Sequence, residues 1–206
     1  MIIGPKYKIA KRLGAPIFEK TQTQKFALSE ARGSAGTKGK QGRRPRAMSD
    51  YKKQLIEKQK MRFTYGISEK QLRRYVDEAL THGHQPIANL ISRLEQRLDN
   101  VVYRLGLAKT RQASRQMTSH GHILVNGRRM TIPSHKVSVG DIITVREGSK
   151  ISALFTDLES RLAGSTVPAW LTFNVREIRG DVKGIPTYEP SETMFDPELV
   201  FEYYSR

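Results

Sequence analysis

Arginine side chains recur at helical spacing and directly after a tight turn within residues 97–145. Arg111 and Arg115 are four residues apart, so that they lie on the same face of a helix. Arg128 follows Asn126-Gly127, a pair that favours a two-residue hairpin turn. The planar guanidinium group matches phosphate oxygens in a bidentate geometry. These arginines therefore predict a surface that binds a phosphate backbone.

The charge of this stretch has a strong sign bias. Residues 97–145 hold eight Lys or Arg and only two acidic residues. A face that only has to be solvated mixes both signs, whereas a face for phosphates does not. The whole chain has 36 Lys and Arg against 20 Asp and Glu, a net charge of +16. Nucleic acid is favoured over an anionic membrane, because no long helix pairs a lysine face with exposed aromatic residues.

The positive charge is concentrated in the first three quarters of the chain. The net charge is +12 over residues 1–60, +7 over residues 61–149 and −3 over residues 150–206. The last quarter is therefore expected to face protein or water rather than a polyanion.

Apolar spacing predicts the elements that position the arginines. Leucine, isoleucine and valine recur every three or four residues over 91–105, which predicts one helix ending at Gly106. Thr110 is expected to cap a second helix, with Ala113 and Met117 facing inward. Strands are predicted on both sides of the Asn126-Gly127 turn and, after Gly140-Asp141, at 142–145.

Other elements are predicted outside this stretch. Ser49 is expected to cap a helix through Arg62, and Ser68 with Gln71 forms a capping box for the next helix. The buried stripe of that second helix is predicted at Leu72, Tyr75, Val76, Ala79 and Leu80. A helix at 151–162, a strand at 170–173, a loop at 180–197 and a last helix at 198–204 follow, the last opened by Asp196 and Pro197.

Motifs along nearly the whole chain resemble the S-four RNA-binding module and the small-subunit ribosomal protein S-four family. In the family's order they are SDYKKQLIEKQKMRFTYGISEKQLRRY at 49–75, LEQRLDNVVYRLG at 94–106, SHGHILVNGRR at 119–129, GDIITVRE at 140–147 and EYYSR at 202–206. The resemblance implies an α+β fold. It combines an extended basic N-terminal arm, a discontinuous helical domain and an inserted module of two short helices plus a small antiparallel sheet. We expect the arm at 1–47, the helical domain at 48–92 completed by 175–206, and the module with its following helix at 93–174.

The expected arm is basic and poor in large apolar residues. Glycines at 33, 36, 39 and 42 punctuate a basic loop, but no strand precedes them and their spacing is not that of a nucleotide-binding loop. Such a segment cannot bury enough to fold alone, so we expect it to order on RNA, with a free tail as the alternative. The chain has no cysteine, which excludes disulfides and thiolate zinc sites. In this respect it resembles the zinc-free members of the family.

Histidines and aromatic residues each allow two interpretations. His-Gly-His occurs at 82–84 and 120–122, but no cysteine or carboxylate accompanies it at ligand spacing, so neither a metal nor a cofactor is predicted. His120 and His122 are instead expected beside RNA phosphates. Three aromatic residues could stack on bases but are more often core at helical spacing, namely Tyr51, Phe63 and Tyr75.

An RNA-modifying enzyme is the competing functional class. Arg97-Leu98-Asp99 resembles the Arg-Leu-Asp of pseudouridine synthases, in which the aspartate is catalytic. Asp99 lies in the module's own first helix, and no further domain of adequate size follows. No nucleophile–base pair or phosphate-binding Gly-Lys-Ser/Thr loop is present elsewhere. We therefore predict no catalytic residue and no enzyme, and expect Asp99 to pair with a nearby arginine.

The resemblance implies a cytoplasmic protein of the small ribosomal subunit, with no membrane association. It implies a primary binder of a multi-helix junction in the 5′ domain of small-subunit rRNA, which nucleates assembly of the body and contributes to translational accuracy. Implied partners are rRNA, mRNA near the entrance of its channel, and small-subunit ribosomal protein five. Because RNA duplexes hide their base edges, binding should rest on shape and phosphates and depend strongly on salt. The residues predicted to bind rRNA are Lys6, Lys8, Lys11, Arg12, Lys38, Lys40, Arg43, Arg44, Arg46, Lys52, Lys53, Arg62, Arg73, Arg74, Arg97, Arg104, Lys109, Arg111, Arg115, His120, His122, Asn126, Arg128 and Arg129.

Overall fold

The computed structural model describes residues 3–36, 48–81, 84–152, 154, 155, 158, 162, 167–190 and 193–205. The predicted basic residues Lys38, Lys40, Arg43, Arg44 and Arg46 lie outside the described residues, as do His82 and half of the predicted helix at 151–162. The chain divides into two compact units, residues 1–80 with 189–206, and residues 81–188.

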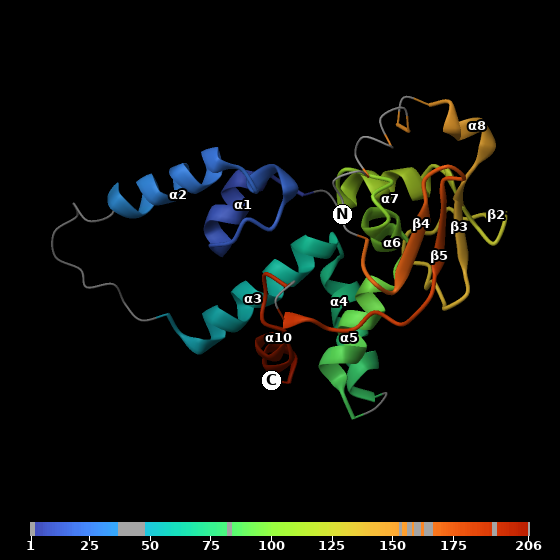
Figure 1. Cartoon of the computed structure of the whole chain (residues 1–206). Coiled ribbons are helices and arrows are strands. Elements are labelled where there is room, and N and C mark those ends of the chain that lie inside the picture. The colour runs from blue at the N-terminus through green and yellow to red at the C-terminus, as the bar shows by residue number, and fades with distance from the viewer. Residues whose placement is uncertain are drawn as a thin grey trace, which may run out of the picture. The chain divides into compact units, whose positions relative to one another are not determined.

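The first unit is helical (Figure 1). Its elements are α1 (Lys6–Leu13), the short 3-10 helix η1 (Glu19–Thr21), α2 (Gln24–Gly36), α3 (Asp50–Tyr65), α4 (Glu69–Thr81) and the C-terminal α10 (Pro197–Tyr204). The resemblance implied that the C-terminal segment packs against the early helices, and α10 does pack on α3.

The N-terminal segment, predicted as an arm that cannot fold alone, forms helices that pack on α3. Leu13, Phe18 and Phe26 are buried there, and Ile56 and Phe63 of α3 pack against them. The apolar residues of this segment therefore form a core together with α3, which supplies additional apolar surface.

The predicted boundaries of α3 and α4 agree with the structure to within a few residues. Gly66 ends α3 with φ 62°, and the capping box of α4 forms through Ser68 and Gln71, with N···O distances of 3.3 and 3.4 Å. The predicted buried stripe of α4 is confirmed except at Leu80, which is 53% exposed.

A buried lysine joins α3 to α4 and α10. Lys58 Nζ lies 2.8 Å from Glu69 Oε1 and 4.3 Å from the centre of the Tyr203 ring. The Tyr204 hydroxyl donates to the same Glu69 oxygen at 2.7 Å. The predicted start of α10 is confirmed, since the Asp196 carboxylate accepts from the Glu198 amide at 2.9 Å.

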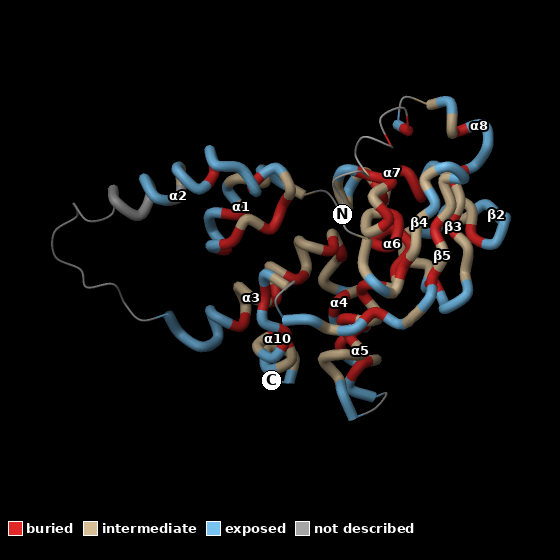
Figure 2. Tube along the Cα trace, viewed as in Figure 1, coloured by how far each residue is buried: buried red, intermediate tan, exposed pale blue. Residues whose placement is uncertain are grey.

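The second unit packs helices against an antiparallel sheet (Figure 1). Its helices are α5 (Pro86–Glu95), α6 (Leu98–Arg104), α7 (Arg111–Ser119) and α8 (Glu147–Lys150). Its strands are β1 (Ile123–Val125), β2 (Arg128–Arg129), β3 (Ile142–Val145), β4 (Leu171–Asn174) and β5 (Arg179–Val182), in the order β2-β1-β3-β5-β4. Buried residues line the inner faces of α6, α7 and the strands (Figure 2).

The single helix predicted over 91–105 is two helices. Arg97 is extended, with φ −69° and ψ 136°, and forms an isolated bridge with Lys136. The amide of Leu98 then donates to the carbonyl of His135 at 2.9 Å. The apolar spacing concealed this break, because Leu94 and Leu98 are both buried on its two sides.

The predicted loop at 180–197 begins with a strand, β5, which lies between β3 and β4 in the sheet. Gly180 is required there, because a Cβ at this position would lie 2.6 Å from Leu105 Cδ1. The expected domain boundary between 174 and 175 would separate two paired strands, and the structural boundary falls at 188 instead. The predicted helix at 151–162 does not begin at Ile151, which lies in an exposed turn.

Candidate nucleic-acid interface

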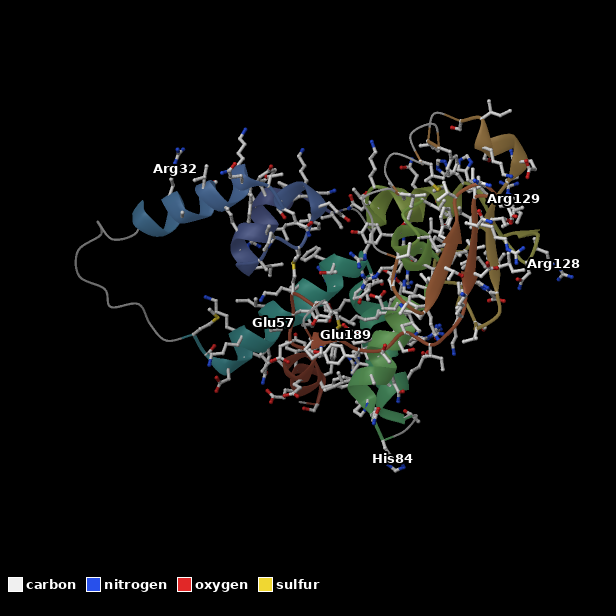
Figure 3. The ribbon with its side chains drawn as sticks, viewed as in Figure 1. Arg32, Glu57, His84, Arg128, Arg129 and Glu189 are labelled. Carbon is white, nitrogen blue, oxygen red and sulfur yellow. The ribbon has the colours of Figure 1, made fainter. Side chains whose placement is uncertain are left out.

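The Asn126-Gly127 turn presents Arg128 to solvent at the edge of the sheet. Asn126 and Gly127 have φ values of 51° and 76°, as the predicted hairpin requires. Arg128 projects away from the ribbon of β2 (Figure 3) and is exposed. Among the described residues, no carboxylate lies within ion-pair distance of it, so its guanidinium group can bind a phosphate without first breaking an ion pair.

Asn126 was predicted to bind RNA, but its side chain is used within the protein. Its Nδ2 donates to Asp141 Oδ1 at 2.8 Å, and its Oδ1 accepts from the Ile142 amide at 2.9 Å. Asn126 therefore fixes the hairpin tip to the start of β3, and its predicted contact with RNA stays a prediction for this exposed residue.

Four basic side chains gather where α7 ends and β1 and β3 pair. We name His120, His122, Arg129 and Arg146 the His–Arg cluster. Arg129 Nη2 donates to the His120 carbonyl at 3.1 Å and its side chain lies against Gly121, where a Cβ would collide with it. The two imidazole rings are 6.1 Å apart, and the Arg146 amide donates to the His122 carbonyl at 2.9 Å.

The electrostatics of the His–Arg cluster favour an anion. Desolvation lowers the pKa of His122, and the charges of His120, Arg146 and Arg129 lower the pKa further. His122 Nδ1 lies 2.9 Å from the Ser149 hydroxyl, which fixes the ring. A phosphate placed here would relieve repulsion among like charges. Sequence reasoning missed Arg146, although it follows β3 directly and pairs opposite His122.

The arginines of α7 have partners inside the protein. Arg115 Nη1 lies 3.3 Å from Asp99 Oδ2, and Arg97 holds both oxygens of the same carboxylate at 3.0 and 2.7 Å. Asp99 therefore pairs with arginines, as predicted. Arg97 itself is fully buried, so its predicted contact with RNA is wrong.

A second polar network connects α5, α6 and α7. Glu95 accepts from Arg104 Nε at 2.9 Å and from Asn100 Nδ2 at 2.7 Å. Arg111 Nε donates to Asn100 Oδ1 at 2.9 Å and stacks on the Tyr103 ring at 4.4 Å. The partly exposed Arg104, Arg111 and Arg115 can still turn a guanidinium edge to solvent, but each also holds the helices together.

The first unit carries a separate set of cations. Lys8, Lys11 and Arg12 are exposed on α1, whereas Lys6 is partly buried and lies 5.7 Å from the Phe18 ring centre. Lys52 and Lys53 are exposed on α3, and Arg73 and Arg74 on α4. Lys109 of the second unit is exposed as well. Two of these side chains have acidic partners, Lys53 with Asp50 and Arg74 with Glu78, and the predicted contact residue Arg62 of α3 pairs with Glu69.

A basic depression between α1 and α2 adds two residues that were not predicted. It is lined by Lys11, Lys25 and Arg32, together with Gln24, Leu28 and Ser29. Lys25 and Arg32 are seven residues apart and share one face of α2. Their spacing would have revealed this face if α2 had been predicted.

The aromatic residues divide between core and surface. Tyr75 is buried, Phe63 packs against the N-terminal core, and the exposed Tyr51 lies 5.7 Å from the Tyr203 ring. Among the described residues, no cluster of His, Asp and Glu could hold a metal ion. Within the same residues, no helix has the length and apolar character of a membrane span.

Comparison with known proteins identifies both parts of the chain. Residues 96–143 match the S4 domain, the S-four module named above, and residues 1–99 match the N-terminal domain of ribosomal proteins S4/S9. Small ribosomal subunit protein uS4 of Roseiflexus castenholzii is 44% identical over 99% of this chain and 98% of its own length. The uS4 proteins of Persephonella marina, 44% identical over 98% of both chains, and of Chloroflexus aurantiacus, 42% identical over 99% and 98%, are similarly close.

Proposed function

The chain belongs to the family of small ribosomal subunit protein uS4, and we propose that it binds a multi-helix junction of small-subunit rRNA through the exposed cations described above. It is a structural protein of the small ribosomal subunit with an S4 RNA-binding domain, not an enzyme. The pseudouridine synthase alternative is therefore rejected. The location predicted from the sequence, the small ribosomal subunit, follows from the same family membership.

One observation carries the proposed mode of binding. At the His–Arg cluster the rings of His120 and His122 are 6.1 Å apart, and the pKa of His122 is lowered first by desolvation and then by the charges of His120, Arg146 and Arg129. Within one folded domain such an arrangement is unfavourable, and an RNA phosphate would turn it into a favourable one. Arg128 at the hairpin tip and the arginines of α7 extend the same basic character along the module.

The finer roles follow from this mode of binding. We propose that the protein is a primary binder of the 5′ domain junction and nucleates assembly of the subunit body. Cations in both units, on α1, α2 and α3 and on the S4 module, support contact with more than one RNA helix. Further contacts with mRNA near the entrance of its channel, with a contribution to translational accuracy, and with small-subunit ribosomal protein five rest on the family resemblance alone.

Hydroxyl-radical footprinting on naked small-subunit rRNA tests the proposal. The purified protein should protect backbone positions from several helices that meet at one junction, with no other protein present. A plain RNA duplex of equal length is the control and should bind weakly. Absence of protection, or equal affinity for the duplex, would overturn the primary-binder proposal.

A further inference from the structure

A pocket of about 340 Å³ lies between α1 and α3, within the first unit. Ile9 and Leu13 of α1 and Leu55, Ile56 and Phe63 of α3 form its apolar lining. Pockets of this size are at the small end of those that hold small molecules. The two helices are seen side by side in Figure 1.

Two polar atoms in the lining residues have no hydrogen-bond partner. Gln59 Oε1, an acceptor, and Arg62 Nε, a donor, are both buried and unsatisfied among the described residues. An unsatisfied buried polar group is unfavourable, so such groups commonly bind a ligand or a water molecule. An acceptor and a donor together match the edge of a nucleobase, which carries both kinds of group.

The pocket also contains a surface for stacking. The Arg62 guanidinium lies 4.8 Å from the centre of the Phe63 ring. Phe63 is in turn held edge-on by Phe18, with 6.3 Å between ring centres. Aromatic rings and guanidinium planes are the side chains on which single unpaired bases stack.

Cations surround the mouth of the pocket. Arg12 and Lys52 line it, both are exposed, and neither has an ion-pair partner among the described residues. An apolar interior with two basic side chains at its mouth is complementary to a base followed by its phosphate. A neutral apolar peptide would leave both cations without a role.

We propose that this pocket receives one unstacked nucleobase of the bound rRNA, with the adjoining phosphate held by Arg12 and Lys52. The base stacks against Phe63, and the Gln59 and Arg62 side chains, whose unsatisfied atoms are enclosed in the free chain, turn toward its edge and hydrogen-bond to it. The inference rests on the proposed function, because it assumes that this chain binds rRNA. It adds recognition of a single base to binding that otherwise depends on shape and phosphates.

Base-specific chemical probing of the rRNA with the full-length protein tests the proposal. The unmodified protein should protect the pairing edge of one unpaired base at the footprint. Gln59→Leu removes the acceptor and keeps a similar volume, whereas Leu55→Trp fills the pocket. Leu55→Trp should re-expose that base and weaken rRNA binding about tenfold, as loss of one stacked base does. Gln59→Leu should re-expose the pairing edge of that base and weaken rRNA binding about fivefold, as loss of one hydrogen bond does. The slope of log affinity against log salt should stay unchanged, because no phosphate contact is removed.

The control variant is Leu80→Trp, which adds the same indole at an exposed position on α4 outside the pocket. It should leave base protection and affinity unchanged. Free Gln59→Leu should be at least as stable as the original chain, since it removes a buried unsatisfied acceptor. Gln59→Leu therefore still tests the proposal if Leu55→Trp fails to fold.

The other outcomes overturn the inference. If rRNA is bound but no base is protected, or the same bases stay protected in folded Gln59→Leu, the pocket holds no base while the proposed function stands. If Leu55→Trp accelerates proteolysis within residues 37–47 of the free protein, the pocket is occupied by the chain itself. If no rRNA is bound at all, the proposed function fails first.

Discussion

Replacing Asp99 with asparagine removes one negative charge from a buried ion pair and leaves the shape of the side chain nearly unchanged. Arg97 is fully buried and holds both Asp99 oxygens, at 3.0 and 2.7 Å, while Arg115 approaches at 3.3 Å. In Asp99→Asn the buried charge of Arg97 loses the carboxylate that it holds at both oxygens. Breaking a buried pair in this way costs about 3–5 kcal/mol.

Urea unfolding, monitored by tryptophan fluorescence, measures this loss of stability in the second unit, to which Asp99 belongs. Trp170 is the single tryptophan of the chain and packs against the same core as α6. With an m-value of about 2 kcal/mol/M, the midpoint of Asp99→Asn should fall by roughly 2 M. Substituting Arg97→Met together with Asp99→Leu should recover part of the loss, because the buried charge of Arg97 is then removed together with its partner.

Glu147→Gln is the matched control within the same unit. Glu147 pairs with Lys150 at 2.6 Å, but its side chain is 85% exposed. The change should therefore cost less than about 1 kcal/mol. If Asp99→Asn also cost less than that, the ion pair would not hold Arg97 in place, and the structural role given to Asp99 would be refuted.

Three further predictions concern other contacts. Gly180→Ala should destabilise the second unit by about 1–3 kcal/mol, because the added Cβ would overlap Leu105. Urea unfolding monitored by Trp170 fluorescence measures the loss, and an unchanged unfolding midpoint would contradict this close approach. Tyr204→Phe removes the 2.7 Å hydrogen bond to Glu69 and should lower the stability of α10 by about 1 kcal/mol. The α10 amides should then exchange hydrogen faster, and unchanged exchange would show that this bond does not stabilise α10. His122 should titrate by NMR below the usual pKa of about 6.5, because desolvation and then the charges of His120, Arg146 and Arg129 disfavour its protonated form. Since the pKa of His122 is lower in the folded than in the unfolded chain, stability should fall as pH drops below the unfolded pKa. Arg146→Gln should raise the titration midpoint of His122, and an unchanged midpoint would exclude a role of Arg146.

Local signals in the sequence predicted one turn and two helix starts correctly. The Asn126-Gly127 turn, the Thr110 cap of α7 and the capping box of α4 each depend on neighbouring residues only, and all three are confirmed. The family motifs added the α+β class and the return of the C-terminal helix to α3, which no local pattern contains.

The errors come from contacts between distant residues. The break at Arg97 depends on a bridge to Lys136, and β5 depends on Gly180 fitting against Leu105. The N-terminal core depends on Phe63, and so does the proposed base pocket. Arg97 was predicted on an RNA surface because helical spacing cannot distinguish an arginine that faces solvent from one that faces a buried aspartate.

The salt dependence of rRNA binding tests most directly whether the S4 module holds RNA through its exposed arginines. Arg128, Arg129 and Arg146 are exposed, so that replacing all three with alanine should preserve the fold. The slope of log affinity against log salt should then fall by about two to three, since each lost phosphate contact removes about 0.7–0.9. Arg176→Ala is the control, because Arg176 is exposed in the turn between β4 and β5, at the opposite edge of the sheet from β2, and it should leave the slope unchanged. A folded triple variant with the full slope would contradict the account and move the phosphate contacts to the cations of the N-terminal unit.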